Sequence, residues 1–253
     1  QEAVDRAAEE IERLDQLLST GNSDSEVFQV NKNGKGTLSQ DTASLVERSL
    51  EFNQATDGLF NIAIYPVMKA WGFADGNFRV PSEETLSELL KLTDVQQIDY
   101  DKETAQISFA VEGMAIDLGG IAKGFTSNRI MDIFRECDVE SGLVNLGGNV
   151  QARGTKTDGS LWRVSIIDPL NTAEMIGVLS IKDRAVVTSG GYERYFEEGG
   201  ITYHHIIDPR TGYPAESGLV SVTIISADGT LADGLSTSFF IMGLDKAQEY
   251  WRE

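Results

Sequence analysis

Hydrophobic residues recur at helical spacing in five parts of the chain. The clearest case is an apolar stripe from Val4 to Leu18, in a segment rich in Ala, Glu and Leu. Ser39 is a candidate N-cap for a second helix, and Pro81, followed by Ser82 and two glutamates, is typical of a first helical turn. The predicted helices are residues 1–18, 40–53, 81–91, 125–136 and 231–242.

Alternating or continuous apolar runs predict β-strands between and after these helices. Residues 95–100 and 104–110 alternate on either side of Asp101-Lys102-Glu103, which predicts a hairpin. Further strand-like runs are residues 162–168, 176–181, 185–189 and 219–226. Helices come first, then strands, then a helix, and no repeat or linker divides the chain. We therefore expect one α+β domain over residues 1–253.

Two other apolar runs end on paired glycines. Residues 111–118 predict a strand that breaks at Gly119-Gly120, and residues 142–150 predict a buried strand that ends on a second pair. Glycines let backbone amides approach a ligand, and a following helix N-terminus with Lys123 in its first turn suits a phosphate. The alternative is a glycine turn with a surface lysine. The stretch matches neither the Walker A loop nor the dinucleotide fingerprint.

Composition narrows the possible ligands. The 253 residues carry a net charge of −19, which argues against nucleic acid as a partner because a basic surface is needed to release counterions. An anionic small ligand then needs a local lysine or a metal ion. No run of about 18 apolar residues and no signal peptide is present in this sequence. Cys137 is the only cysteine, so no internal disulfide forms.

Few side chains are suited to catalysis. The two histidines, His204 and His205, are adjacent, so the paired spacings of zinc enzymes are absent, as is a Gly-x-Ser-x-Gly elbow. Asp233 and Thr237 are four residues apart and share a helical face, where they offer a carboxylate and a hydroxyl to a hard cation. The alternative for Asp233 and Thr237 is ordinary helix capping, and the alternative for His205 is a hydrogen-bonded structural histidine. The residues alone indicate metal-assisted phosphate chemistry, with His205 as the most suitable base.

Six motifs in this order resemble those of the FAD:protein FMN transferase family, also called the ApbE family, over essentially the whole chain. The motifs are Asp57-Gly58-Leu59-Phe60 with Trp71-Gly72-Phe73, Asp117-Leu118-Gly119-Gly120-Ile121-Ala122-Lys123-Gly124, Asn145-Leu146-Gly147-Gly148-Asn149, Thr188-Ser189-Gly190, His205-Ile206-Ile207-Asp208-Pro209-Arg210-Thr211-Gly212 and Ala232-Asp233-Gly234-Leu235-Ser236-Thr237. The resemblance implies a T-fold-like α+β architecture of mixed antiparallel sheets with packed helices.

The same resemblance implies a set of site residues. It implies that Mg²⁺ is held by the Gly120 carbonyl with Asp233 and Thr237, and that His205 takes the proton of an acceptor hydroxyl. Contacts with the FAD nucleotide are implied for Leu59, Phe60, Asn61, Asp117, Lys123, Ser189 and Ile207. Many relatives have Asp where this chain has Asn61 and Tyr where it has Gly21, so we expect one ring-stacking contact to be missing.

The implied activity is Mg²⁺-dependent transfer of FMN from FAD to a Ser or Thr hydroxyl of a partner flavoprotein, with release of AMP. Two alternatives stay open. In an FAD pyrophosphatase, water replaces the hydroxyl at the same metal site and the products are FMN and AMP. In a flavin-binding module, FAD binds without turnover.

The resemblance also carries expectations about the chain's ends and location. Family members usually begin with a strand that contains Met-Gly-Thr and continue past the last helix with further strands, and we expect Gln1–Glu253 to lack both. They are usually exported lipoproteins, so we expect the full-length protein to lie outside the cytoplasmic membrane, attached through a lipid anchor that this sequence does not contain. Cys137 lies well inside the chain and is not that anchor.

Overall fold

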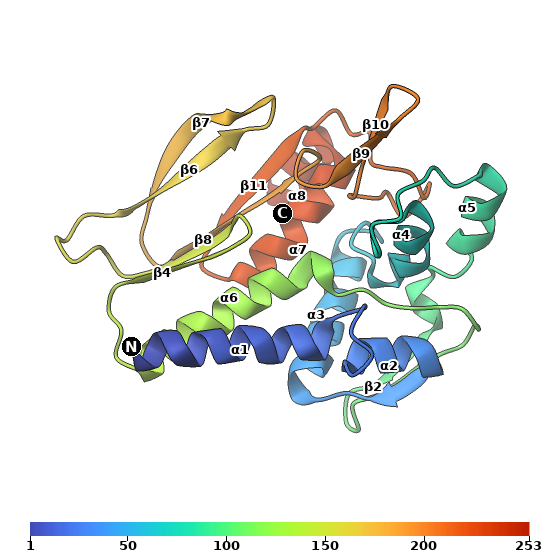
Figure 1. Cartoon of the computed structure of the whole chain (residues 1–253), viewed down its shortest axis with the longest axis horizontal. Helices are drawn as coiled ribbons and strands as arrows, with labels where there is room; N and C mark the ends of the chain where they lie inside the picture. The colour runs from blue at the N-terminus through green and yellow to red at the C-terminus, as the bar shows by residue number, and fades with distance from the viewer. Residues whose placement is uncertain (253) are drawn as a thin grey trace.

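Helix α1 (Glu2–Leu18) lies along helix α6 (Gly119–Glu136) in the computed structural model, which describes residues 1–252 (Figure 1). Ala3 and Ala7 on α1 pack against Ile130 and Phe134 of α6, because alanines leave room for the larger side chains. The first predicted helix is confirmed, although Val4 is 62% exposed and not part of the buried stripe.

Helix α6 also crosses helix α7 (Gly229–Met242), and together these two helices form the centre of the molecule (Figure 1). The other helices are α2 (Glu26–Asn33), α3 (Gln40–Ala55), α4 (Tyr65–Trp71), α5 (Glu83–Leu90) and α8 (Leu244–Arg252). The predicted helices at 40–53 and 231–242 are confirmed as α3 and α7. Within residues 1–252, no helix is both long enough and apolar enough to span a membrane.

Two helix starts differ in detail from the sequence prediction. Helix α5 begins at Glu83 with Ser82 as its N-cap, because the Ser82 hydroxyl accepts the Thr85 N–H at 3.2 Å, so Pro81 precedes the helix. Ser39 does occupy the N-cap of α3, but its hydroxyl donates to Glu26 at 2.9 Å and accepts no backbone N–H of the helix.

A four-stranded antiparallel sheet in the order β11-β8-β5-β4 packs against α6 and α7. Its strands are β4 (Gly142–Leu146), β5 (Asn149–Arg153), β8 (Arg184–Gly190) and β11 (Ser221–Ser226). The opposite face is covered by a hairpin of β6 (Trp162–Asp168) and β7 (Asn171–Ile181), as Figure 1 shows. Val150 and Ala152 of β5 pack towards this hairpin, with Val164 and Ile181. Since side chains alternate along a strand, Asn149 and Gln151 face the helices.

The predicted strand that ends on Gly147-Gly148 is confirmed as β4, but residues 142–150 are not one buried strand. They lie in a hairpin in which Gly147 and Gly148, with φ of 60° and 94°, form the two-residue turn between β4 and β5. Strand β4 is at best half-buried, because it is the edge strand of the sheet.

The predicted strand at residues 111–118 is wrong. Residues 111–113 form a bend and a turn, with Gly113 at a φ of 92°. No strand pairs with the residues that follow, because Asn31 satisfies both the N–H and the carbonyl of Ile116, at 2.7 and 2.8 Å. The next N–H, of Asp117, donates to the Ile62 carbonyl at 2.8 Å. Helix α6 then begins at Gly119, six residues before the predicted start, so the paired glycines form its first turn.

Two small sheets complete the fold. The predicted hairpin is confirmed as β2 (Ile98–Asp101) and β3 (Gln106–Phe109), and β1 (Lys35–Thr37) adds to β3. Strands β9 (Tyr195–Glu198) and β10 (Ile201–His204) form a second hairpin, which no sequence pattern predicted. Its Phe196 and Tyr203 rings pack at a tilt against Trp71, which is fully buried and donates to the Gly212 carbonyl at 2.7 Å.

Candidate active site

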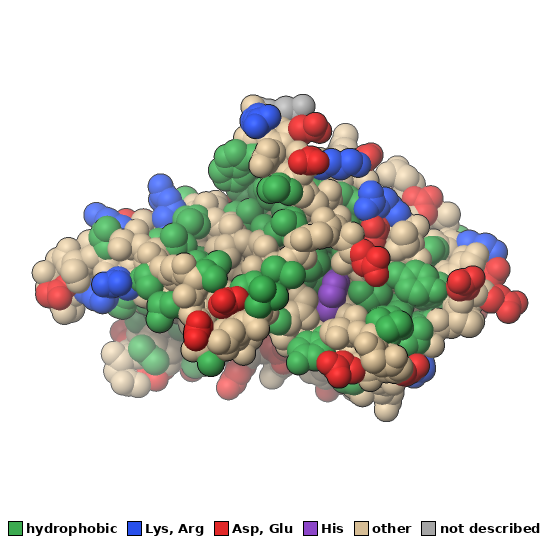
Figure 2. Space-filling model, turned by 90° about the horizontal axis from the view of Figure 1, so that it is seen from above, with side chains coloured by type: hydrophobic (Ala, Val, Ile, Leu, Met, Phe, Trp, Pro, Cys, Tyr) green, Lys and Arg blue, Asp and Glu red, His purple; other side chains and the backbone are tan. Residues whose placement is uncertain are grey.

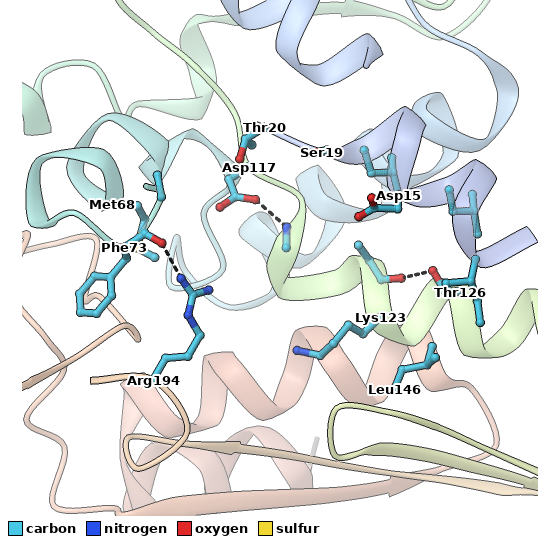
Figure 3. Close-up of a pocket in the computed structure, with 16 residues that line it drawn as sticks. Asp15, Ser19, Thr20, Met68, Phe73, Asp117, Lys123, Thr126, Leu146 and Arg194 are labelled. Carbon is cyan, nitrogen blue, oxygen red and sulfur yellow. Dashed lines mark hydrogen bonds between the residues drawn. The ribbon is translucent and has the colours of Figure 1, made fainter. Parts of the chain in front are cut away.

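A cavity of about 410 Å³ opens beside the first turns of α6 (Figure 3). Its wall includes Asp117, Lys123 and Arg194, together with residues from the C-terminal end of α1 and the Met68–Phe73 segment. This volume lies within the range typical of small-molecule sites. The side chain of Lys123 is exposed, and in Figure 3 its ammonium group extends into the space between α6 and Arg194.

Asp117 and Arg194 define the end of the cavity near the start of α6. The Asp117 carboxylate accepts the Gly119 N–H at 2.8 Å, which occupies one of the free amides of the helix N-terminus. Burial raises the pKa of Asp117, against the opposing effects of this hydrogen bond and of the Arg194 guanidinium. Arg194 donates to the Phe73 carbonyl (Figure 3). The Asp117 side chain and a helix N-terminus therefore lie side by side at this end.

Asp233 on α7 reaches the backbone of α6 from the other side. Its carboxylate accepts the Gly124 N–H at 2.7 Å and is only 3% exposed. In an α-helix this N–H points at the carbonyl four residues earlier, which is that of Gly120. The Asp233 carboxylate and the Gly120 carbonyl therefore converge on the same N–H.

Thr237 lies one turn beyond Asp233 on the same face of α7. Its hydroxyl is 3.3 Å from the hydroxyl of Ser189 on β8, which also contacts the Ser236 hydroxyl at 2.8 Å. The structure thus brings Gly120, Asp233, Thr237 and Ser189, four of the residues singled out from the sequence, into one region.

The close approach of α6 and α7 depends on two glycines. A Cβ on Gly124 would lie 2.2 Å from the Gly229 carbonyl oxygen, and a Cβ on Gly229 would lie 2.6 Å from the Ser127 hydroxyl. Any larger residue would push the helices apart. The same contact fixes the distance between Gly120 on α6 and Asp233 on α7.

The electrostatics of this region suit a cation. Burial raises the pKa of Asp233 to about 6, while the positive charge of Lys123 and the Gly124 hydrogen bond act against the increase. A buried carboxylate with a neutral N–H as its hydrogen-bond donor still lacks a compensating charge. Across residues 1–252, no group of three or more His, Cys, Asp or Glu side chains could hold a metal ion. A carboxylate, a hydroxyl and a carbonyl are nonetheless hard oxygen donors, and Mg²⁺ commonly takes one or two carboxylates and completes its shell with water and phosphate.

His205 lies next to the same charges. Burial, together with the positive charges of Arg194 and Lys123, lowers its pKa to about 4, so the ring is neutral at physiological pH. Its Nδ1 is 3.2 Å from the Arg194 carbonyl, and its ring packs edge-on against Phe73. On the face seen in Figure 2, histidine surface appears at one place, between hydrophobic side chains.

The other residues implied by the resemblance do not line the cavity, and their side chains pack into the protein. Leu59, Phe60 and Ile207 are buried in separate hydrophobic clusters. Phe60 supports the site, since its ring edge lies 3.3 Å from where a Cβ on Gly120 would be. Asn61 caps a short 3₁₀ helix by accepting the Ala63 N–H at 2.8 Å.

Three residues near this region were missed by the sequence analysis. Arg194 and its neighbour Glu193 follow the Thr188-Ser189-Gly190 motif, and their adjacent charges after a glycine pair were the only available signal. Burial raises the pKa of Glu193, with the charges of Lys123 and Asp233 acting on it in opposite directions. Asn149 is the last residue of the Asn145–Asn149 motif, but only the structure shows that it is buried.

Comparison with known proteins gives a consistent result. A model of the ApbE family matches residues 1–253. A Klebsiella pneumoniae protein named FAD:protein FMN transferase is 37% identical over 240 residues, which are 93% of this chain and 74% of the relative. A Treponema pallidum protein of the same name is 35% identical over 260 residues, covering 96% of this chain and 72% of the relative.

Solved structures agree with the sequence comparison. The crystal structure of the ApbE protein of Thermotoga maritima has a TM-score of 0.92 at 36% identity, covering 98% of this chain and 81% of that one. The apo flavinyl transferase ApbE of Pseudomonas stutzeri has a TM-score of 0.87 at 31% identity, with coverages of 98% and 78%. The expected α+β architecture is confirmed, and this chain belongs to the ApbE family.

Proposed function

We propose that this chain transfers the FMN half of FAD to a Ser or Thr hydroxyl of an acceptor protein and releases AMP. The observation that carries the proposal is the buried Asp233 carboxylate, which accepts the Gly124 N–H. The residue before Gly124 is Lys123, which lines the ligand-sized cavity. Relatives that are 37% and 35% identical to this chain over the aligned residues are named FAD:protein FMN transferase, which supports the same activity.

In the proposed reaction the acceptor hydroxyl oxygen attacks the phosphorus on the FMN side of the diphosphate. A new P–O bond forms, the anhydride P–O bond breaks, and AMP leaves with the bridging oxygen. His205, being neutral, is able to take the hydroxyl proton. Lys123 offsets negative charge on the diphosphate.

Asp233, Thr237 and the Gly120 carbonyl would hold Mg²⁺, which supplies charge neutralisation at the diphosphate when bound. Ionised Asp233 is the negative member of this donor set. Thr237 contributes a hydroxyl whose position is fixed by Ser189, at 3.3 Å. The glycine contact between α6 and α7 holds these donors together before any ligand arrives.

The test is incubation of the protein with FAD, Mg²⁺ and a peptide that carries a Ser or Thr in a flavinylation motif, with the matching Ala peptide as control. We expect fluorescent peptide adduct and AMP in equal amounts, and no adduct with the Ala peptide. Free FMN and AMP without adduct would identify an FAD pyrophosphatase instead. Tight FAD binding without AMP release at any Mg²⁺ concentration would identify a binding module.

We further propose that the full-length protein acts outside the cytoplasmic membrane, attached by a lipid. The support is family membership, since the members are usually exported lipoproteins. The reading frame upstream of Gln1 tests this: a signal peptide followed by a cysteine supports export, and a start codon directly before Gln1 contradicts it.

A further inference from the structure

Asn149 is buried at the start of β5, and neither atom of its side-chain amide has a hydrogen-bond partner within residues 1–252. The residue is 2% exposed, and both Nδ2 and Oδ1 are unpaired. Leaving a buried polar group unpaired costs about 1–3 kcal/mol, so such a group in a native fold calls for a reason.

Gln151, two residues along the same strand, shows that this face of β5 can satisfy an amide. Gln151 is 5% exposed and accepts from the Ser127 hydroxyl at 2.6 Å, and its Nε2 donates to Asn128 at 3.0 Å. Both partners are on α6. The two amides share a chemical type, a strand and a face, and they differ in that only Gln151 is paired by the protein.

The side chain of Asn149 faces the candidate site. Its direct cross-strand partner is Leu146, and directly opposed side chains in an antiparallel pair point to the same face. Leu146 lines the cavity next to Lys123 (Figure 3).

The direction of β5 places Asn149 beside the first turns of α6. Arg153, at the end of β5, donates to the Val139 carbonyl beyond the C-terminal end of α6, whereas Gln151 bonds Ser127 in its middle. Strand and helix therefore run the same way. Asn149 lies two residues before Gln151, a distance of about 6.6 Å along the strand. One helical turn before Ser127, about 5.4 Å along α6, are Lys123 and Gly124. Asn149 therefore lies level with these two residues of α6.

Glu193 borders Asn149 on the other side. A Cβ on Gly148, the residue before Asn149, would lie 3.9 Å from a Glu193 carboxylate oxygen. The Glu193 carboxylate thus lies at the turn that precedes Asn149. The charges of both Lys123 and Asp233 act on Glu193, which ties this corner to the candidate site.

We propose that Asn149 is a ligand-binding residue of this site, whose Nδ2–H donates a hydrogen bond to an oxygen of the diphosphate held by Lys123. The adjacent ammonium group selects an anion, and phosphate oxygens are acceptors that match an amide donor. The inference rests on the proposed function in that FAD supplies the diphosphate. The Asn149 amide, which has no partner within the protein, would gain one when the nucleotide binds.

The experiment compares Asn149→Leu with Gln151→Leu, using FAD and ADP as probes in the presence of Mg²⁺. Leucine matches the shape of asparagine and removes both unpaired atoms. We therefore expect Asn149→Leu to leave the melting temperature of the ligand-free protein unchanged or raised, and to weaken FAD and ADP binding by about 10-fold to 100-fold. Gln151→Leu should lower the melting temperature and change FAD affinity by no more than about two-fold, since its partners are in the protein.

The outcomes separate the two proposals. If Asn149→Leu lowers the melting temperature as Gln151→Leu does and leaves both affinities unchanged, Asn149 is a structural residue paired by an ordered water, and the inference is overturned. If the unsubstituted protein binds ADP but not FAD, and Asn149→Leu weakens ADP binding, the proposed function fails and the inference stands. If it binds neither probe, both fail. Should Asn149→Leu not fold, Asn149→Asp keeps the size, and its negative charge should weaken FAD binding even more.

Discussion

Replacing Asp233 with asparagine should stabilise the metal-free protein while removing its response to Mg²⁺. Asn keeps the shape and can still accept the Gly124 N–H, which the carboxylate accepts at 2.7 Å. What it removes is a charge that burial disfavours. A pKa of about 6, compared with the usual 3.8, corresponds to roughly 3 kcal/mol of folding free energy when Asp233 is ionised.

The pH range of the effect follows from the direction of the shift. At low pH, Asp233 is protonated in both the folded and the unfolded state and does not affect stability. As the pH rises from about 4 to about 6, the unfolded state loses this proton first, so the free energy of unfolding falls. Above pH 6 the full loss applies. In Asp233→Asn this pH dependence should disappear, and at neutral pH the melting temperature should rise by as much as about 6–12 °C.

The measurement is thermal unfolding of both forms in a chelator across this pH range, repeated with increasing Mg²⁺, together with AMP release. Mg²⁺ should stabilise the unsubstituted protein and leave Asp233→Asn unchanged, and AMP release should be lost. Asp228→Asn is the matched control, since Asp228 caps the same helix by accepting from Thr230 and Leu231. Equal stabilisation of both forms by Mg²⁺, or a less stable Asp233→Asn at neutral pH, would refute the reasoning.

Three other substitutions test separate parts of the structure. Gly124→Ala places a Cβ 2.2 Å from the Gly229 carbonyl and should destabilise the fold by about 3 kcal/mol or more in urea unfolding; an unchanged midpoint would show that the helices separate freely. His205→Gln should slow FMN transfer by about 10²-fold or more. The factor should be the same at every pH above about 6, because a pKa of about 4 keeps His205 neutral there. An inflection near pH 6.5 in the pH–rate profile that the substitution abolishes would contradict this. Trp71→Phe should lower the free energy of unfolding, measured in urea, by about 2 kcal/mol, because the Gly212 carbonyl loses its donor at 2.7 Å. A loss of less than about 0.5 kcal/mol would argue against a buried hydrogen bond at Trp71.

Long periodic segments of this fold were predictable, and short ones were predictable only where cap or turn residues marked them, as in α5 and the β2–β3 hairpin. Helices α1, α3 and α7 span 14 to 17 residues, so their apolar stripes repeat often enough to be read. Helices α2 and α4 have 8 and 7 residues, and two turns do not establish a period. The failed strand at residues 111–118 has a different cause: Asn31, 85 positions away from Ile116, takes the hydrogen bonds that a neighbouring strand would have made.

Part of the candidate site was likewise predictable from the sequence, and part was not. The spacing of Asp233 and Thr237 placed them on one helical face, which α7 confirms. Their meeting with Gly120 depends on how two glycines let α6 and α7 touch, a long-range contact for which the residues alone hold no pattern. That Asn149 is buried and unpaired likewise depends on the whole sheet and on α6, so no local signal marks it.

The hydrogen bond between Asp233 and Gly124 joins residues 109 positions apart, so its two partners leave the ribosome at different times. Lys123 and the start of α6 emerge first, and the carboxylate follows only after the entire sheet has been synthesised. A nascent chain that stops before α7 carries the lysine without the acidic residue, and its α6 contains Gly120 and Gly124, poor helix formers, on the face that α7 would cover. Capacity for Mg²⁺-dependent cleavage of FAD would therefore arise only near the end of synthesis, and prematurely terminated products should leave the cell's FAD intact.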